Sequence, residues 1–414
     1  MGFRPHSWVV RCYCKIVADP LYKNSIYISL SRIFDIGFGV LFWIIAARIY
    51  SIDDVGVATA LVSMLLLIVT FSRMGFDLTL IRFRQKYGQE TVINTSLALT
   101  SILSVLIGLV LFMIVQYFFP SIHFFYGINY WLFIFVILGC SITFTMGYAF
   151  LAIKEAKFRV IQNLLMGIRI LFLFFLLAYG AAGIFLSIGF AYILVAIWAI
   201  VLLRRLMILN LQIDRNFIKD TLKFNSGNYV STLLNTAPAI FLPLLIISVL
   251  SESDAALFYI AFSIGNVISV IPDAINLSFF VEGSNGTCLR KKAVSSLKGI
   301  VIMVIPAVIV VSIFAKEILS IFGAQYTSAS EILVLLSISM IAITIYNLFI
   351  PLQYIRMEIR SVICTTFIRM VLILVFCYCL MLQFGLVGVG LGWLVAHIVM
   401  LIGIAVIARS KKWI

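Results

Sequence analysis

Long hydrophobic runs alternate with short polar segments along almost the whole chain. Most runs contain about twenty residues or more, which is the length an α-helix needs to cross the hydrocarbon core of a bilayer. We therefore predict an all-α polytopic membrane protein with about twelve transmembrane helices. The predicted spans lie near residues 25–49, 56–79, 92–119, 130–153, 160–179, 182–203, 226–250, 256–281, 293–315, 331–355, 361–382 and 385–408.

The second half of the chain resembles the first when the sequence is shifted by about 200 residues. Matching positions in the two halves are Asn24 and Asn225, Asp54 and Asp254, Arg169 and Arg369, and Gly180 and Gly385. Each half holds an even number of spans, so both halves enter the membrane in the same direction. We expect two pseudo-symmetric six-helix halves around a central cavity.

This repeat gives a predicted domain organisation. The parts are a cytoplasmic N-terminal arm (1–23), an N-terminal lobe (24–205), a basic cytoplasmic linker (206–223), a C-terminal lobe (224–408) and a cytoplasmic tail (409–414). Composition agrees, because 64% of residues are hydrophobic and only 11% are charged, which excludes an ordinary soluble protein. The arm is too polar for a cleavable signal peptide, so we expect the first span to be retained.

The net charge of +14 is distributed unevenly. Lysine and arginine concentrate in the N-terminal arm, the tail and every second loop, whereas the loops of the opposite side contain only Arg48 and Lys316. By the positive-inside rule, both termini lie in the cytoplasm and the protein spans the cytoplasmic membrane. The basic charge is thus a signal of topology, assisted by anionic lipids, and does not indicate nucleic acid as a partner.

Four predicted spans carry their polar residues on one helical face, which indicates a surface turned away from lipid. These residues are Ser25, Ser29, Arg32, Asp35 and Gly39 in the first span, Thr59, Ser63, Thr70, Arg73 and Asp77 in the second, Asn225, Asn228, Thr232, Asn235 and Ala239 in the seventh, and Ser263, Asn266, Ser269, Asp273 and Asn276 in the eighth. We expect these faces to line a shared cavity that water can enter.

Four arginines lie inside predicted spans: Arg32, Arg73, Arg169 and Arg369. Each would cost about 2.5–3.5 kcal/mol at the centre of a lipid-facing helix, so each needs a partner or an aqueous path. Arg169 and Arg369 have no acid within one helical turn, which favours an anionic ligand. For Arg32 the alternative is a neutral structural pair with Asp35, three residues away.

Arg73 and Asp273 occupy equivalent positions near the cytoplasmic ends of the second and eighth spans. Equivalent positions can meet at a pseudo-two-fold axis, so we hypothesise that this pair bridges the halves when the cavity is closed to the cytoplasm. The alternative is that Arg73 pairs locally with Asp77, one turn further on.

The sequence offers little support for an enzyme or a metalloprotein. Its seven cysteines show no metal-ligand spacing, and it has no phosphate-binding loop for ATP. Asp53 and Asp54 lie in the first outer loop, where a polyprenyl-sugar-dependent membrane glycosyltransferase would place carboxylates. That loop is too short to build an acceptor site, so we interpret both residues as the acidic first turn of the second span.

Two segments resemble the polysaccharide or O-antigen flippases of the multidrug/oligosaccharidyl-lipid/polysaccharide exporter superfamily. The segment IDDVGVATALVSMLLLIVTFSRMGFDLTLIRF from Ile52 is similar to the family's acid–x–Gly loop, second span and following turn. The segment LSIFGAQYTSASEILVLLSIS from Leu319 is similar to its Phe-Gly-x-x-Tyr outer turn, here Phe322, Gly323 and Tyr326. The resemblance extends over residues 24–408.

The resemblance implies a function and a set of binding residues. Such a protein moves a polyprenyl-pyrophosphate-linked oligosaccharide from the inner to the outer leaflet by alternating access, for assembly of cell-surface polysaccharide. Arg32 would hold the diphosphate, supported by Asp35, with Arg169 and Arg369 as further candidates. The residues implied to contact sugar hydroxyls are Asn228, Asn235, Asn266 and Asn276. The seventh span has no cation equivalent to Arg32, which departs from an even cationic lining.

Partners and alternatives follow from the same reading. We expect a lipid-linked oligosaccharide and membrane lipids as partners, and a polysaccharide polymerase or ligase as a candidate neighbour. No cofactor is expected, while coupling to a proton or sodium gradient stays open. A multidrug or small-solute exporter of the same superfamily is the main alternative, although its site would favour acids facing a cationic drug.

Overall fold

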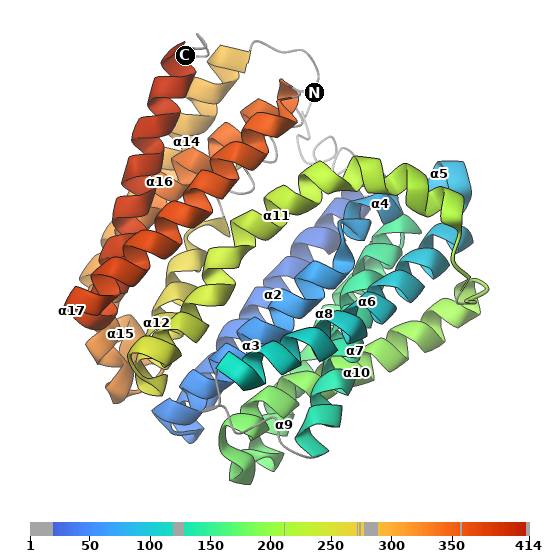
Figure 1. The fold of residues 1–414 in the computed structure, drawn as a ribbon, viewed down its shortest axis with the longest axis horizontal. Helices are drawn as coiled ribbons and strands as arrows, with labels where there is room; N and C mark the ends of the chain where they lie inside the picture. Colours follow the sequence, from blue (N-terminus) through green and yellow to red (C-terminus); the bar gives the residue numbers. More distant parts are fainter. Residues whose placement is uncertain are drawn as a thin grey trace, which may run out of the picture. The chain divides into compact units, whose positions relative to one another are not determined.

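The computed structural model describes residues 20–118, 128–210, 212–270, 272, 275–276, 289–356 and 358–410. Every regular element within these ranges is helical (Figure 1). The first half contains α2 (Pro20–Ile49), α3 (Ile52–Arg73), α4 (Phe76–Arg82), α5 (Arg84–Tyr87), α6 (Gln89–Phe118), α7 (Ile128–Ala152), α8 (Ala156–Leu165), η2 (Met166–Ile168), α9 (Arg169–Phe175), η3 (Leu177–Tyr179) and α10 (Gly180–Leu206). The second half contains α11 (Arg215–Val249), α12 (Glu252–Val267), α14 (Leu289–Ile313), α15 (Ala315–Ser320), η4 (Ala324–Ala329), α16 (Ser330–Ile355) and α17 (Ile359–Ser410).

Ten helical segments among the described residues are long and apolar enough to cross a membrane. One of them, Arg360–Val406, turns back on itself at Gly385 and therefore holds the two last predicted spans. The eighth predicted span is described in part, through α12, because residues 277–288 lie outside the described ranges. The prediction of an all-α membrane protein with about twelve spans is confirmed.

The chain divides by its internal contacts into two compact units. The first unit takes residues from 1–42, 68–178 and 185–225, and the second takes residues from 43–67, 179–184 and 226–414. The division passes through α2 and α3, so the two helix ends that face each other across Ser51 belong to the second unit. By their contacts, these two helix ends belong with the C-terminal helices. The lobe boundaries inferred from the sequence stay predictions.

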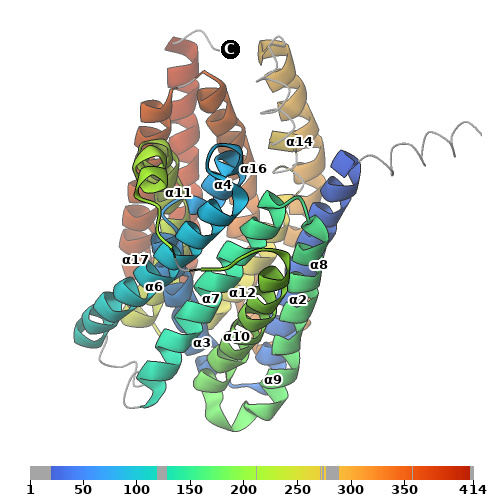
Figure 2. The same cartoon turned by 90° about the vertical axis from the view of Figure 1, so that its right-hand side faces the viewer.

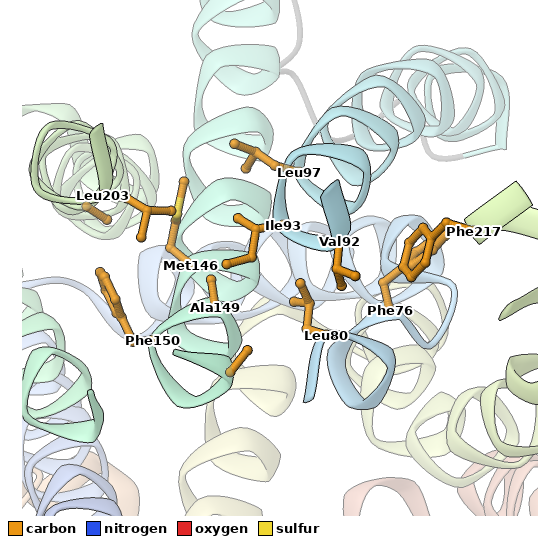
Figure 3. Close-up of a cluster of buried hydrophobic side chains, with 12 residues drawn as sticks. Phe76, Leu80, Val92, Ile93, Leu97, Met146, Ala149, Phe150, Leu203 and Phe217 are labelled. Carbon is orange, nitrogen blue, oxygen red and sulfur yellow. The ribbon is translucent and has the colours of Figure 1, made fainter. Parts of the chain in front are cut away.

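The first unit has a hydrophobic core at the end of its helices where α4, α6, α7, α10 and the start of α11 meet (Figure 3). Phe217 of α11 is fully buried there, and its ring lies 6.2 Å from that of Phe76 and 5.6 Å from that of Tyr87. Much of the predicted linker is therefore structured, since α11 already begins at Arg215.

In the second unit, α14, α16 and the two arms of α17 run side by side (Figures 1 and 2). The two arms of α17 pack closely at Gly388 and Gly392, which have no side chain. A Cβ on Gly388 would lie 2.0 Å from the Leu380 carbonyl oxygen, and one on Gly392 would lie 2.5 Å from Cys377 Cα. Small residues spaced four apart allow this backbone approach between membrane helices.

Two predicted spans are shorter or more broken than their hydropathy indicates. The second span ends at Arg73 because Met74 (φ 43°) and Gly75 (φ 76°) adopt left-handed conformations that stop the helix. The fifth span is divided into α8, the 3₁₀ turn η2 and α9. Hydropathy predicts burial in a membrane and carries no information on such local backbone changes.

The sequence repeat has a counterpart in local structure. Ser51 and Ser251 precede α3 and α12, and each hydroxyl accepts a hydrogen bond of 3.1 Å from the backbone N–H of the aspartate three residues on. Each hydroxyl also donates to the carboxylate of that aspartate, Asp54 or Asp254. The acidic first turn predicted for the second span is confirmed.

We expect Ser51→Ala and Ser251→Ala to destabilise the protein by similar amounts, about 1 kcal/mol each, because each removes an equivalent N-cap. Thermal unfolding in detergent would measure both, with Ser51→Thr as a control that retains the capping oxygen. A large loss for one serine and none for the other would contradict equivalent capping.

Candidate functional site

Arg32 and Asp35 lie on an exposed part of α2, within the first span. In the part of the chain that the structure describes, no ion pair joins them to each other or to another residue. The neutral structural pair that was the alternative for Arg32 is therefore not formed in this structure. The side chains of Ser25 and Ser29, predicted for the same face, lie outside the described residues.

Arg169 approaches the same face of α2 from the start of α9. A Cβ added to Gly39, two turns after Arg32, would lie 3.6 Å from Nη2 of Arg169, and the guanidinium lies 5.5 Å from the ring centre of Phe42. Its buried Nε has no hydrogen-bond partner, and among the described residues Arg169 forms no ion pair. The first unit thus brings Arg169 to the α2 face that carries Arg32.

Arg369, the repeat counterpart of Arg169, is 7% exposed within the second unit. Its Nη2 donates a hydrogen bond of 3.1 Å to the backbone carbonyl of Asn235, and its guanidinium lies 4.7 Å from the ring centre of Tyr346. Arg369 is therefore held by the backbone of α11 and the ring of Tyr346. Its Nε is buried and has no hydrogen-bond partner.

The four asparagines predicted to contact sugar have different surroundings. Asn235 is exposed, Asn266 is half-buried, and Asn276 is buried with neither amide atom hydrogen-bonded. The side chain of Asn228 lies outside the described residues. Their role in binding stays a prediction.

Arg73 forms the local ion pair that was one of its two predicted arrangements. Its Nη1 lies 2.8 Å from Oδ2 of Asp77 across the break between α3 and α4, and its guanidinium lies 4.9 Å from the ring centre of Phe144. Asp273 lies outside the described residues, so its bridge to Arg73 in another conformation stays a hypothesis.

The second unit also holds a contact that the sequence did not predict, at the end where α2 turns into α3. The distribution of lysine and arginine predicts that this end faces outward, and we call it the outer end. A Cβ on Gly56 would lie 1.7 Å from the carbonyl oxygen of Glu252, so the starts of α3 and α12 touch through their backbones. The rings of Trp43 and Tyr259 lie 4.7 Å apart beside this contact.

Polar contacts fix the same end to the turn between α15 and α16. Arg48 Nε donates a hydrogen bond of 2.7 Å to the carbonyl of Ile321, and the Gln325 amide donates one of 3.4 Å to the carbonyl of Ala47. The Asp54 carboxylate accepts a hydrogen bond of 2.8 Å from the backbone N–H of Ala181. The outer halves of α2 and α3 are thus anchored at several points within the second unit.

Burial, and then the carboxylates of Asp53 and Asp54, raise the pKa of Glu252 above its ordinary value of 4.5. A raised pKa means that the folded state favours the neutral acid, and this contribution to stability is lost as pH rises through the folded-state pKa. We therefore expect Glu252→Gln to raise the melting temperature at pH 7, and the difference to disappear below pH 4.5. Equal melting temperatures at pH 7 would contradict this.

Comparison with known proteins identifies a matching family and structures with a similar fold. A family model described as polysaccharide biosynthesis protein matches residues 21–280, and no protein of curated function matches in sequence. An inward-facing multidrug resistance MATE transporter of the MOP superfamily is similar in structure, with a TM-score of 0.70, 16% identity, and coverage of 94% of this chain and 99% of the other.

Two other structures are similar. The lipid II flippase MurJ in an inward closed conformation has a TM-score of 0.71 and 15% identity, over 94% of this chain and 87% of its own. A MOP superfamily transporter from Pyrococcus furiosus, described as having reversed polarity of its binding pocket, has a TM-score of 0.62 and 16% identity over 96% and 98%. At such identities these structures establish the fold, that of a multi-pass helical membrane protein.

Proposed function

Because the chain belongs to the polysaccharide biosynthesis protein family, we propose that it is a flippase for a polyprenyl-pyrophosphate-linked oligosaccharide. It moves this lipid from the inner to the outer leaflet of the cytoplasmic membrane, where the glycan is used for surface polysaccharide assembly. It performs no covalent chemistry on its cargo. Transport is driven by the proton or the sodium gradient.

The observation that carries the proposal is the exposed, unpaired Arg32 inside a membrane span, with Arg169 beside the same helical face. Guanidinium stays charged at every physiological pH and presents a planar fork of N–H donors that matches phosphate oxygens. Its insertion cost of about 2.5–3.5 kcal/mol is offset when an anion binds it. A diphosphate is the group of the lipid-linked sugar that fits this chemistry.

Alternating access requires an end that closes and reopens. The outer end has the properties of such a closure, because α3 and α12 begin in backbone contact at Gly56 and Glu252. The closest approach is between backbones, and the surrounding hydrogen bonds of Arg48, Gln325 and Asp54 can exchange partners with water, so the helix starts can separate while each helix stays intact. We propose that it closes the outer path while cargo enters from the inner leaflet.

The second candidate function is export of a small solute, which the similarity to multidrug transporters favours. A lipophilic cation would need an acidic partner inside the membrane. On the face of α2 the one acid, Asp35, stands beside Arg32, and Arg169 adds a second positive charge. The electrostatics of this face therefore favour an anionic cargo.

The proposal is tested with purified protein in liposomes. A fluorescent polyprenyl-pyrophosphate oligosaccharide is followed between leaflets under a proton gradient, a sodium gradient and no gradient, in parallel with uptake of a lipophilic cationic dye. We expect exchange of the glycolipid and none of the dye. Dye transport without glycolipid exchange would assign the protein to solute export, and sugar transfer to an acceptor would make it an enzyme.

A further inference from the structure

A groove of about 510 Å³ opens in the second unit, between the ends of α14, α15 and α16 and the second arm of α17. It lies on the side predicted to face outward. Its walls are mostly apolar and are formed by Ile313, Ala315, Val334, Leu335, Val387 and Leu391. A volume of this size is typical of sites that bind one small molecule or headgroup.

The groove is also lined by charged and polar side chains. Lys316, Glu317 and Glu331 line it, and among the described residues none of the three forms an ion pair. The hydroxyl of Ser312 is buried in the same place without a hydrogen bond, and Ser330 stands opposite at the start of α16. One cation and two anions, all exposed, thus line a groove whose other walls are mostly apolar.

The groove borders a surface suited to lipid. Only 17% of the residues in the membrane segment of α14 are buried within the protein. Ile309 and Ile313 of α14, and Phe314 directly after it, are exposed. An exposed apolar helix surface that ends beside charged side chains has the same division into apolar and polar parts as a phospholipid.

We propose that the groove binds the headgroup of a zwitterionic phospholipid that carries a primary ammonium, such as phosphatidylethanolamine. The Lys316 ammonium pairs with the phosphate, and Glu331 and Glu317 accept hydrogen bonds from the lipid ammonium. The acyl chains lie along the exposed surface of α14. This lipid is distinct from the transported cargo and stabilises the packing of α14 on α16.

The charges select among headgroups. An anionic glycerol headgroup has hydroxyl donors but no positive charge, and its net negative charge is repelled by the two carboxylates. A choline headgroup has the right charges, but its quaternary nitrogen has no N–H to donate, so it cannot form charge-assisted hydrogen bonds with Glu331 or Glu317. A primary ammonium provides three donors.

Lipid binding is measured by native mass spectrometry of the whole protein, exchanged into phosphatidylethanolamine, phosphatidylcholine or phosphatidylglycerol of the same chain length. We expect the ethanolamine lipid to be retained about tenfold more strongly than the others, and this preference to be lost in Lys316→Ala and Glu331→Gln. The matched control removes an exposed ion pair elsewhere, Lys157 with Glu155, which should leave the preference unchanged.

Two further measurements keep the outcome decisive. Val334→Trp fills the groove from its apolar wall and leaves every charge in place, so it should also abolish retention of the lipid. This variant tests the proposal even if the variants of the charged residues do not fold. Free phosphoethanolamine is added to delipidated protein and should not restore its melting temperature. Equal retention of all three lipids, or stabilisation by the free headgroup alone, would overturn the proposal.

Discussion

Replacing Arg32 by alanine should reduce leaflet exchange of the pyrophosphate-linked oligosaccharide about ten- to a hundredfold, with the protein still folded. The factor corresponds to the loss of hydrogen bonds to a charged group, which contribute about 1.5–3 kcal/mol. Folding should be preserved because Arg32 is exposed and makes no ion pair in the part of the chain that the structure describes. Exchange is measured in liposomes at equal protein content.

Three controls make the result specific. Arg32→Lys keeps the charge but removes the planar fork, so it should retain part of the activity. Asp35→Asn should leave exchange near the wild-type rate, because no ion pair joins Asp35 to Arg32 in the part of the chain that the structure describes. Ile33→Ala alters the neighbouring side chain, which is 64% exposed, and should have no effect. If Arg32→Ala and Ile33→Ala exchanged lipid equally fast, Arg32 would have no role in binding the diphosphate.

The sequence predicted the helices well because membrane insertion imposes one simple requirement, a long apolar run in which the helix satisfies its own backbone. The predicted second span continued to residue 79, past the end of α3, because apolar residues such as Phe76 and Leu78 follow the left-handed turn at Met74 and Gly75. The start of α11 lies within the predicted linker, where charged residues form a helix and Phe217 packs into the core of the first unit.

For the candidate site, the sequence identified charged residues but not their surroundings. Arg169 and Arg369 were predicted as equivalent, and both lack an ion pair among the described residues. Yet Arg169 reaches the face of α2, whereas Arg369 is buried against Tyr346 and the carbonyl of Asn235. Helical periodicity places a residue on a face, and only tertiary packing decides what that face meets.

The motifs that carried the family resemblance have a physical explanation in the outer end. Gly56, the glycine of the acid–x–Gly loop, is the residue that allows α3 to touch α12. Gly323 has a φ of 145°, which favours glycine, and a Cβ added to it would lie 3.8 Å from the carbonyl oxygen of Ala47. Tyr326 of the same turn is fully buried. The residues of both motifs thus lie at the outer end, within the second unit. The sequence alone does not show that these two distant loops meet there.

Gly56→Val is expected to abolish transport by preventing this closure. Its Cβ would lie 1.7 Å from the Glu252 carbonyl oxygen and 2.5 Å from its carbonyl carbon, both backbone atoms that no rotamer change can move away. The starts of α3 and α12 must separate, at a cost of about 1–3 kcal/mol or more in the closed state. Because the open state carries no such penalty, the population shifts towards it, and exchange should fall at least about tenfold.

The shift is measured by labelling a cysteine placed at Ala255, which is fully buried one turn after Glu252, in a background without the native cysteines. A membrane-impermeant maleimide added from outside should react slowly with the parent and quickly with the Gly56→Val variant. Gly37→Val is the matched control, since a Cβ on Gly37 meets no atom within 4 Å. Fast labelling of the Gly37→Val control would mean that valine in a helix is enough to cause the effect. Slow labelling of both Gly56→Val and Gly37→Val would show that the outer end does not open by separation of α3 and α12.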